Sequence, residues 1–215
     1  MRARAPEPRP RDASGAEALV RRALAGAAGP TSDHDPHDGD PNPGLAPPVG
    51  RLLTPAAVLM AVDLSGPQAR VILTKRSAHL RHHPGQIALP GGRIDPADAD
   101  ATSAALREAR EEVGLPGGAA EVLGAFGPHE TVTGFSVTAV VALIREPFEP
   151  RPEAGEVEEV FSVPLAHLLD PASYRVEGRR WQGVPRRYWV VPHGPRYVWG
   201  ATARMLLSLA RGARA

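Results

Sequence analysis

One strong helix signal lies among apolar, β-branched runs, and this arrangement limits the folds open to the chain. Residues Ala101 to Val113 follow Asp100, a candidate N-cap, and precede Gly114, a typical C-terminal stop, with Pro116 just beyond. Runs typical of strands lie on both sides of this helix, at 56–62, 69–75, 86–89, 121–126, 136–144 and 157–163. This order predicts an α+β fold with a mixed β-sheet.

Weaker signals add elements to this frame. A turn at Gly66-Pro67 predicts that the first two strands form a hairpin. Towards the end of the chain we expect a short helix opened by Pro164, a second hairpin and a closing helix, at 164–169, 187–191 with 196–199, and 201–210.

Residues 1–50 differ in composition from the rest of the chain. A modest apolar stripe predicts a helix over 12–27, which either lies on the domain or is free of it. The stretch 29–50 is rich in Asp, Pro and Gly and almost lacks apolar residues, so burial cannot repay the entropy of ordering it. We therefore expect an N-terminal helix and flexible linker over 1–50, and one folded domain over 51–215.

Composition limits the ligands. Lys and Arg number 25 against 24 Asp and Glu, a net charge of +1, so no overall field favours nucleic acid or a membrane surface. The chain has no cysteine, which leaves carboxylates and histidines as metal ligands. No apolar run approaches about 18 residues and no signal core follows Met1, so we expect a cytoplasmic protein with a small-molecule ligand.

Three carboxylates share one side of the predicted helix. Glu108 lies three and four residues before Glu111 and Glu112, a spacing at which like charges repel by a few tenths of a kcal/mol per pair. A divalent cation reverses the sign of this interaction, and hard oxygen ligands suit Mg²⁺ or Mn²⁺. The alternative is a solvated acidic face compensated by Arg107 and Arg110. The Gly91-Gly92 pair just upstream favours a site, because a backbone without side chains can approach a ligand.

These residues resemble the box of the Nudix hydrolase family, which reads Gly, five residues, Glu, seven residues, then Arg-Glu-aliphatic-any-Glu-Glu-any-Gly-aliphatic. The pattern here has Gly92, then Asp98 in place of the Glu, one extra loop residue, and Arg107-Glu-Ala-Arg-Glu-Glu-Val-Gly-Leu115. The resemblance implies a Nudix-type α/β/α sandwich with a mixed sheet.

Two signatures are similar to the coenzyme A diphosphatase branch of that family. One is Gly-Gly-Arg-Ile-Asp-Pro-Ala-Asp over 91–98. The other is an upstream motif, present here as Ile-Leu-Thr-Lys-Arg-Ser over 72–77, then Arg81, then Gly85 leading to Pro-Gly-Gly at 90–92. The resemblance spans about Thr54 to Leu207, and two linked motifs make chance agreement improbable.

The resemblance also implies roles for the acidic helix. Glu108 and Glu112 would ligate metal, Glu111 would assist as ligand or base, and Arg107 would steer the carboxylates by ion pairing. A carbonyl of Gly91 or Gly92 would complete the metal site. Nudix enzymes often recruit an acid outside the box, for which Glu156 is our candidate and Glu130 its rival; a surface role remains open for both.

The upstream motif carries the substrate hypothesis. Coenzyme A has a diphosphate and a separate 3′-phosphate, which need guanidinium or hydroxyl donors. Arg76, Ser77 and Arg81 are the candidates; for Arg76, a structural ion pair at the end of a strand is an equal alternative.

The implied activity is Mg²⁺- or Mn²⁺-dependent hydrolysis of the diphosphate of coenzyme A or a derivative, to 3′,5′-ADP and 4′-phosphopantetheine or its acyl form. One alternative is a hydrolase of a different substrate, either another nucleoside diphosphate derivative such as ADP-ribose or an oxidised nucleoside triphosphate. The other is a binding module that lost catalysis. The sequence leaves open a homodimer.

Overall fold

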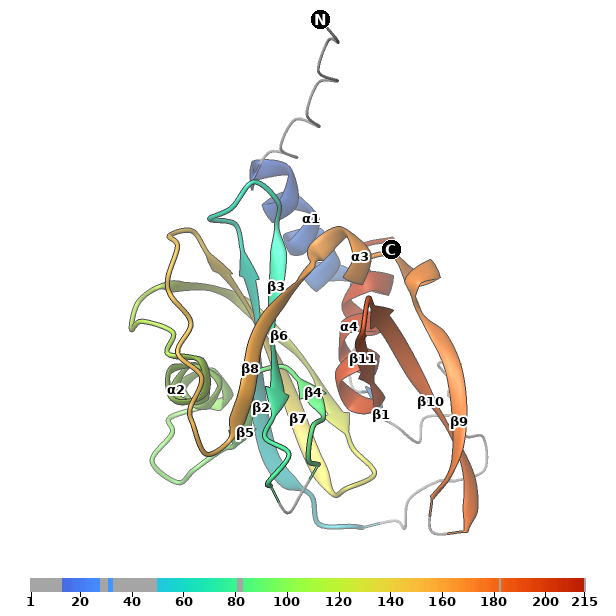
Figure 1. Ribbon diagram of the computed structural model, residues 1–215. Coiled ribbons are helices and arrows are strands. Elements are labelled where there is room, and N and C mark those ends of the chain that lie inside the picture. Colours follow the sequence, from blue (N-terminus) through green and yellow to red (C-terminus); the bar gives the residue numbers. More distant parts are fainter. Residues whose placement is uncertain (1–12, 28–30, 33–49, 81–82, 182, 215) are drawn as a thin grey trace, which may run out of the picture.

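The computed structural model describes residues 13–27, 31–32, 50–80, 83–181 and 183–214. The predicted helices and strands are present in the predicted order, together with four short or edge elements that the sequence did not predict (Figure 1). The elements are α1 (Ala13–Gly26), β1 (Thr31–Ser32), β2 (Thr54–Asp63), β3 (Arg70–Arg76), β4 (Ile87–Ala88), β5 (Gly91–Arg93), α2 (Ala101–Val113), β6 (Ala120–Glu130), β7 (Phe135–Ile144), β8 (Val157–Pro164), α3 (Leu165–Leu168), η1 (Pro171–Ser173), β9 (Arg175–Trp181), β10 (Val184–His193), β11 (Arg196–Trp199) and α4 (Gly200–Gly212).

The main sheet is mixed, as predicted. Its strands lie in the order β1-β6-β7-β2-β3-β4, with β5 paired to β2 and β8 paired to β3. Strand β2 runs parallel to β7 along its whole length and antiparallel to β3, which it meets through the predicted Gly66-Pro67 turn. The central strands are therefore buried on both faces, which explains why their sequences are continuous apolar runs.

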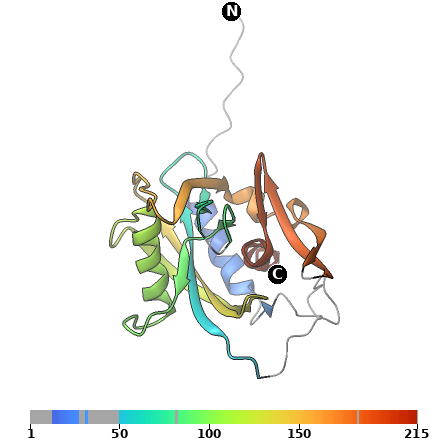
Figure 2. The ribbon, with the colours of Figure 1, turned by 60° about the horizontal axis from the view of Figure 1, so that its bottom comes forward.

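Helices cover both faces of this sheet, so the predicted α/β/α sandwich is confirmed (Figure 2). Successive residues of a strand point to opposite faces, and β2 divides accordingly. The side chains that pack towards α1 and α4 are Ala56, Met60 and Val62. Those that pack towards α2 are Ala57, Leu59 and Ala61.

A second, three-stranded antiparallel sheet in the order β11-β10-β9 lies outside α4 (Figure 1). The predicted second hairpin corresponds to β10 and β11. Strand β9 was missed, because its sequence Arg-Val-Glu-Gly-Arg-Arg-Trp lacks an apolar alternation and contains Gly178. As an edge strand it exposes most of its polar side chains, so burial leaves little signal in the sequence.

Helix α1 lies on the domain, which decides between the two alternatives for the predicted N-terminal helix. Val20 and Ala23 are fully buried in the core beside α4. A β-carbon at Gly212 of α4 would lie 2.7 Å from the carbonyl carbon of Gly26, so the two helices are in close contact. Arg145 at the end of β7 pairs with Glu17 of α1 at 2.8 Å.

The expectation that the stretch 29–50 would not order is wrong for Thr31 and Ser32. These residues form β1 and pair in parallel with His129 and Glu130 of β6. The prediction considered burial of side chains, whereas a strand at a sheet edge is held by backbone hydrogen bonds that need no apolar residue. Residues 28–30 and 33–49 lie outside the described part of the chain.

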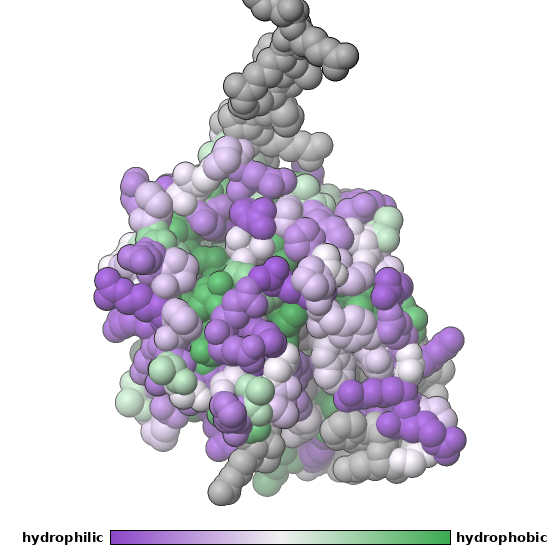
Figure 3. All heavy atoms as spheres, viewed as in Figure 1, coloured by the Kyte–Doolittle hydropathy of each residue, from purple (hydrophilic) through white to green (hydrophobic). Residues whose placement is uncertain are grey.

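The face seen in Figure 3 is largely hydrophilic, and hydrophobic atoms emerge mainly where Figure 1 places α2 and β8. Within the described residues, no helix is both long enough and apolar enough to span a bilayer.

Candidate active site

Helix α2 begins and ends at the residues that the sequence predicted. The carboxylate of Asp100 accepts a hydrogen bond from the Ser103 amide at 2.7 Å, as an N-cap does. Gly114 adopts the left-handed conformation, with a φ of 70°, and its N–H donates to carbonyls of the last turn. Small residues, mainly alanines, form the buried stripe of the helix, so its axis can lie close to the sheet.

Glu112 is the most buried of the three helix carboxylates. Its side chain is 6% exposed, and its Oε2 accepts a hydrogen bond from the Gly91 amide at 3.0 Å. Burial raises the pKa of Glu112 to about 7, although the Gly91 amide acts in the opposite direction. The guanidinium of Arg76 lies 3.9 Å from its other oxygen, at the limit of an ion pair. The negative charge of Glu112 is therefore only partly compensated by its neighbours.

The Gly91-Gly92 pair forms most of β5, a strand that the sequence did not predict. Gly91 has a φ of 155°, and a β-carbon there would lie 2.6 Å from the Cα of Val58. A β-carbon at Gly92 would lie 2.6 Å from the carboxyl carbon of Glu108. Gly91 needs glycine because its φ is positive and the backbone of β2 leaves no room for a side chain, whereas a side chain at Gly92 would displace the Glu108 carboxylate.

Burial and an ion pair act on the pKa of Glu108 in opposite directions. Its side chain is 17% exposed, and burial raises its pKa while the hydrogen bond from Arg107 lowers it. Together with Glu112 it faces the backbone of β5. Glu111 differs, because its side chain is 56% exposed and its contact is the ion pair with Arg107 at 3.0 Å.

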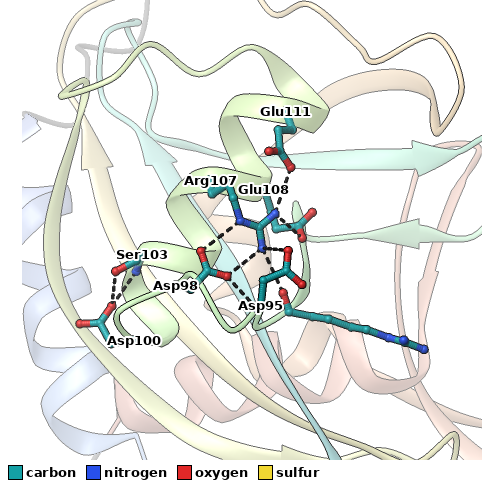
Figure 4. A network of polar contacts seen from close by, with 8 residues as sticks. Asp95, Asp98, Asp100, Ser103, Arg107, Glu108 and Glu111 are labelled. Carbon is teal, nitrogen blue, oxygen red and sulfur yellow. Dashed lines mark hydrogen bonds and ion pairs between the residues drawn. The ribbon is translucent and has the colours of Figure 1, made fainter.

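Arg107 lies among four carboxylates (Figure 4). Its guanidinium donates to both oxygens of Asp98, at 3.1 and 2.9 Å, and also to Glu108 and Glu111. Asp95 is a more distant partner at 3.7 Å. These contacts raise the pKa of Arg107 and, through its hydrogen bonds, lower that of Asp98. One cation faces four anions, so the region carries excess negative charge.

Asp98, which stands where the family box has Glu, has no role predicted from the sequence. In the structure the Asp98 carboxylate pairs with Arg107 and accepts a hydrogen bond from the Asp95 amide at 2.8 Å. The Asp98 side chain is 7% exposed. The Asp-Pro-Ala-Asp turn thus fixes the arginine from the side opposite the helix carboxylates. The repeated aspartate, three residues apart and flanking a proline, was the available signal.

The end of β3 brings the upstream motif to the same place. Arg76 faces Glu112, and the Ser77 amide donates to the carbonyl of Glu156 at 2.8 Å. Glu156 is exposed, and its charge is near enough to raise the pKa of both Glu108 and Glu112. Arg81 lies outside the described residues. Glu130, the rival of Glu156 for the acid outside the box, is instead paired with Arg51 at 2.7 Å.

A family model described as NUDIX domain matches residues 54–183. The chain belongs to the Nudix hydrolase family. The uncharacterised Nudix hydrolase NudL of Escherichia coli K12 is 43% identical over 155 residues, which cover 72% of this chain and 80% of that protein. NudL of Salmonella paratyphi B is 44% identical over 155 residues, which also cover 72% of this chain and 80% of that protein. Among solved structures, the Nudix hydrolase RenU of M. smegmatis is 29% identical, with a TM-score of 0.43, over 54% of this chain and 73% of that one.

As a Nudix hydrolase the protein is a pyrophosphohydrolase, and enzymes of this family generally use divalent metal ions. The oxygen donors of Glu108 and Glu112 suit such an ion, because they are largely buried beside a bare glycine backbone with their charge only partly balanced. In the part of the chain that the structure describes, no three acidic or histidine side chains already surround one point as ligands. Arg107 and the Gly91 amide hold these oxygens instead.

Proposed function

We propose that the protein is a Mg²⁺- or Mn²⁺-dependent diphosphatase that hydrolyses coenzyme A or its derivatives to 3′,5′-ADP and 4′-phosphopantetheine or its acyl form. The observation that carries the proposal is the position of Arg76 in the upstream motif. Arg76 at the end of β3 lies 3.9 Å from Glu112 of α2, which supports a single site that combines a cation for phosphate with the acidic box. Guanidinium groups suit the phosphates of coenzyme A, and a metal-binding face suits its diphosphate.

In this proposal each side chain has a distinct task. Glu108 and Glu112 hold the metal, Glu111 is an additional ligand or base, and the carbonyl oxygen of Gly92 is a further metal ligand. When bound, the metal neutralises the charge of the diphosphate and lowers the pKa of a water. Arg107 orients the carboxylates, and Asp98 holds Arg107 in turn.

Substrate binding falls to Arg76, Ser77 and Arg81, the upstream motif. Glu156 is a better candidate for the general base than Glu130. The charge of Glu156 raises the pKa of both Glu108 and Glu112, whereas Glu130 is paired with Arg51. The proposal places the enzyme in the cytoplasm, with a nucleotide conjugate as its small-molecule ligand and no nucleic acid or membrane partner.

A substrate panel tests the reaction. Purified protein is incubated with Mg²⁺ or Mn²⁺ and with coenzyme A, an acyl-coenzyme A, ADP-ribose and an oxidised nucleoside triphosphate, and the products are separated. We expect 3′,5′-ADP from the first two at rates well above those of the others. Preferential cleavage of ADP-ribose or of the triphosphate would replace the coenzyme A assignment with that substrate.

The variant Arg76→Ala tests the specificity. If Arg76 contacts the 3′-phosphate, KM for coenzyme A should rise tenfold or more, since a charge-assisted hydrogen bond contributes about 1.5–3 kcal/mol, while KM for dephospho-coenzyme A stays unchanged. Arg110→Ala is the matched control, because this exposed arginine of α2 has no ion pair among the described residues. Equal losses on both substrates would assign Arg76 to the diphosphate or to the α2 carboxylates instead.

A further inference from the structure

The loop before β8 is bound directly to the last turn of α2. The Arg151 amide donates to the carbonyl of Val113 at 2.9 Å, and the Glu153 amide donates to the carbonyl of Glu112 at 3.1 Å. Because carbonyls at a helix C-terminus lack partners within the helix, these bonds satisfy them and fix the loop to the helix end. The loop is therefore held against the helix turn that carries Glu112.

Glu153 also organises the turn that follows it. Its carboxylate accepts hydrogen bonds from the amides of Gly155 and Glu156, each at 2.8 Å. Its carbonyl accepts from the amides of Glu156 and Val157, at 3.2 and 2.9 Å. A carboxylate that receives two amides from residues two and three positions further on fixes a tight turn, in the manner of an Asx turn.

The same turn is joined to the third segment of the site. The carbonyl of Glu156 accepts the amide of Ser77 at 2.8 Å, at the end of β3. A continuous chain of hydrogen bonds thus leads from the Glu112 carbonyl through Glu153 and Glu156 to Ser77. Glu153 is the only member that contributes an amide, a carbonyl and a carboxylate to this chain.

We propose that Glu153 is a positioning residue, which holds Glu156 in register with Glu112 and Ser77. This inference rests on the proposed function in one respect, the assignment of Glu156 as the acid outside the box. Glu153 itself is exposed, and within the described residues it contacts only backbone groups of this loop and of α2. Its effect on turnover is therefore exerted through Glu156 rather than through the substrate.

The test compares Glu153→Ala with Glu153→Asp, which keeps a carboxylate able to cap the turn. We expect Glu153→Ala to lower kcat tenfold or more with KM changed less than about twofold, because small displacements of a reacting group are costly. The melting temperature should fall by less than about 5 °C, and Glu153→Asp should regain most of kcat. Glu149→Ala removes the same charge from the same loop and is the control, because its carboxylate has no hydrogen bond or ion pair within the described residues.

A double-mutant cycle separates positioning from general structural damage. If Glu153 acts through Glu156, then Glu153→Ala should cost nothing further in a Glu156→Gln background. Parental kcat in Glu153→Ala, parental kcat in Glu156→Gln, or additive losses in the double variant would each overturn the proposal. The assay uses whichever conjugate of the panel the parent hydrolyses, so an error in the coenzyme A assignment leaves this result unaffected.

Amide hydrogen exchange supplies a readout that is independent of turnover. The amides of Gly155, Glu156 and Ser77 should exchange faster in Glu153→Ala than in the parent, because their acceptors are lost or displaced. Unchanged exchange at these three amides would also overturn the proposal.

Discussion

The two faces of the main sheet are packed by different kinds of side chain. On the α2 face, the helix contributes mainly alanines, namely Ala104, Ala105 and Ala109, with Val113 at its end. On the opposite face, α4 contributes Met205, Leu206, Leu207 and Leu209. The central strands thus share one core cluster with small residues of α2 and, on their other face, a second cluster to which α4 adds large residues.

The difference separates catalytic geometry from stability. Small side chains let α2 approach the sheet until Glu108 meets Gly92 and Glu112 accepts the Gly91 amide. They bury little apolar area, so this face adds less hydrophobic free energy than the α4 face does. Variants on the two faces should therefore fail in different ways.

Turnover should respond most strongly to a change of Glu112 on the α2 face. Glu112→Gln keeps shape and helix propensity but removes one negative ligand from a metal that must also hold substrate oxygens. We expect kcat for coenzyme A to fall at least ~10²-fold, roughly 2.7 kcal/mol, and extra Mg²⁺ or Mn²⁺ to restore it only in part.

The same variant should not lose stability. Burial raises the pKa of Glu112 from 4.5 to about 7, so the folded protein binds this proton more tightly than the unfolded chain does. Stability is then lost as the pH rises from about 4.5 through 7, and Gln removes that loss. In metal-free protein, thermal melts at pH 8 should find Glu112→Gln equal to or more stable than the parent. A large drop would mean that the carboxylate has a structural role.

A stability defect of slightly smaller size is expected on the α4 face. Leu206 is 1% exposed, and Leu206→Ala should lower the free energy of unfolding by about 2.5 kcal/mol through lost burial and a cavity. Turnover per folded molecule should stay within about twofold, since no α2 contact changes. Urea unfolding with parallel kinetics checks both statements. A tenfold loss of kcat in fully folded protein would show that the two faces are coupled.

The smallest effect concerns α1, which packs on the α4 face. Deletion of residues 1–27 exposes the core that Val20 and Ala23 cover and removes the Glu17–Arg145 ion pair. We expect the melting temperature to fall by more than about 5 °C, a shift that corresponds to about 1 kcal/mol or more, with kcat retained. A melting temperature equal to the parent's would mean that the helix contributes no net stability.

The sequence predicted the parts of the fold that local signals determine. Asp100 and Gly114 mark the ends of α2 through capping and the left-handed conformation, and both depend on neighbours within a few residues. The apolar runs of β2, β3 and β7 identify buried strands because both of their faces are covered. The acidic spacing of 108, 111 and 112 predicted a shared face, although burial later distinguishes Glu112 from the exposed Glu111.

The rest depends on contacts between distant segments, which no local pattern encodes. Gly91-Gly92 forms a strand because β2 lies beside it and needs bare backbone there. The pairing of Asp98 with Arg107, and the packing of α1 on Gly212, likewise join residues that only the folded chain brings together. Metal roles for the carboxylates and substrate contacts for Arg76 and Ser77 stay predictions.

In the proposed function, the acidic face of α2 supports metal-dependent cleavage of a diphosphate. The most direct measurement is the turnover of coenzyme A by chelator-stripped protein during titration with Mg²⁺ or Mn²⁺. We expect no turnover in chelator and a saturable recovery as metal is added, with 3′,5′-ADP as a product. Full turnover in chelator would refute metal dependence and leave the acidic face as a solvated surface.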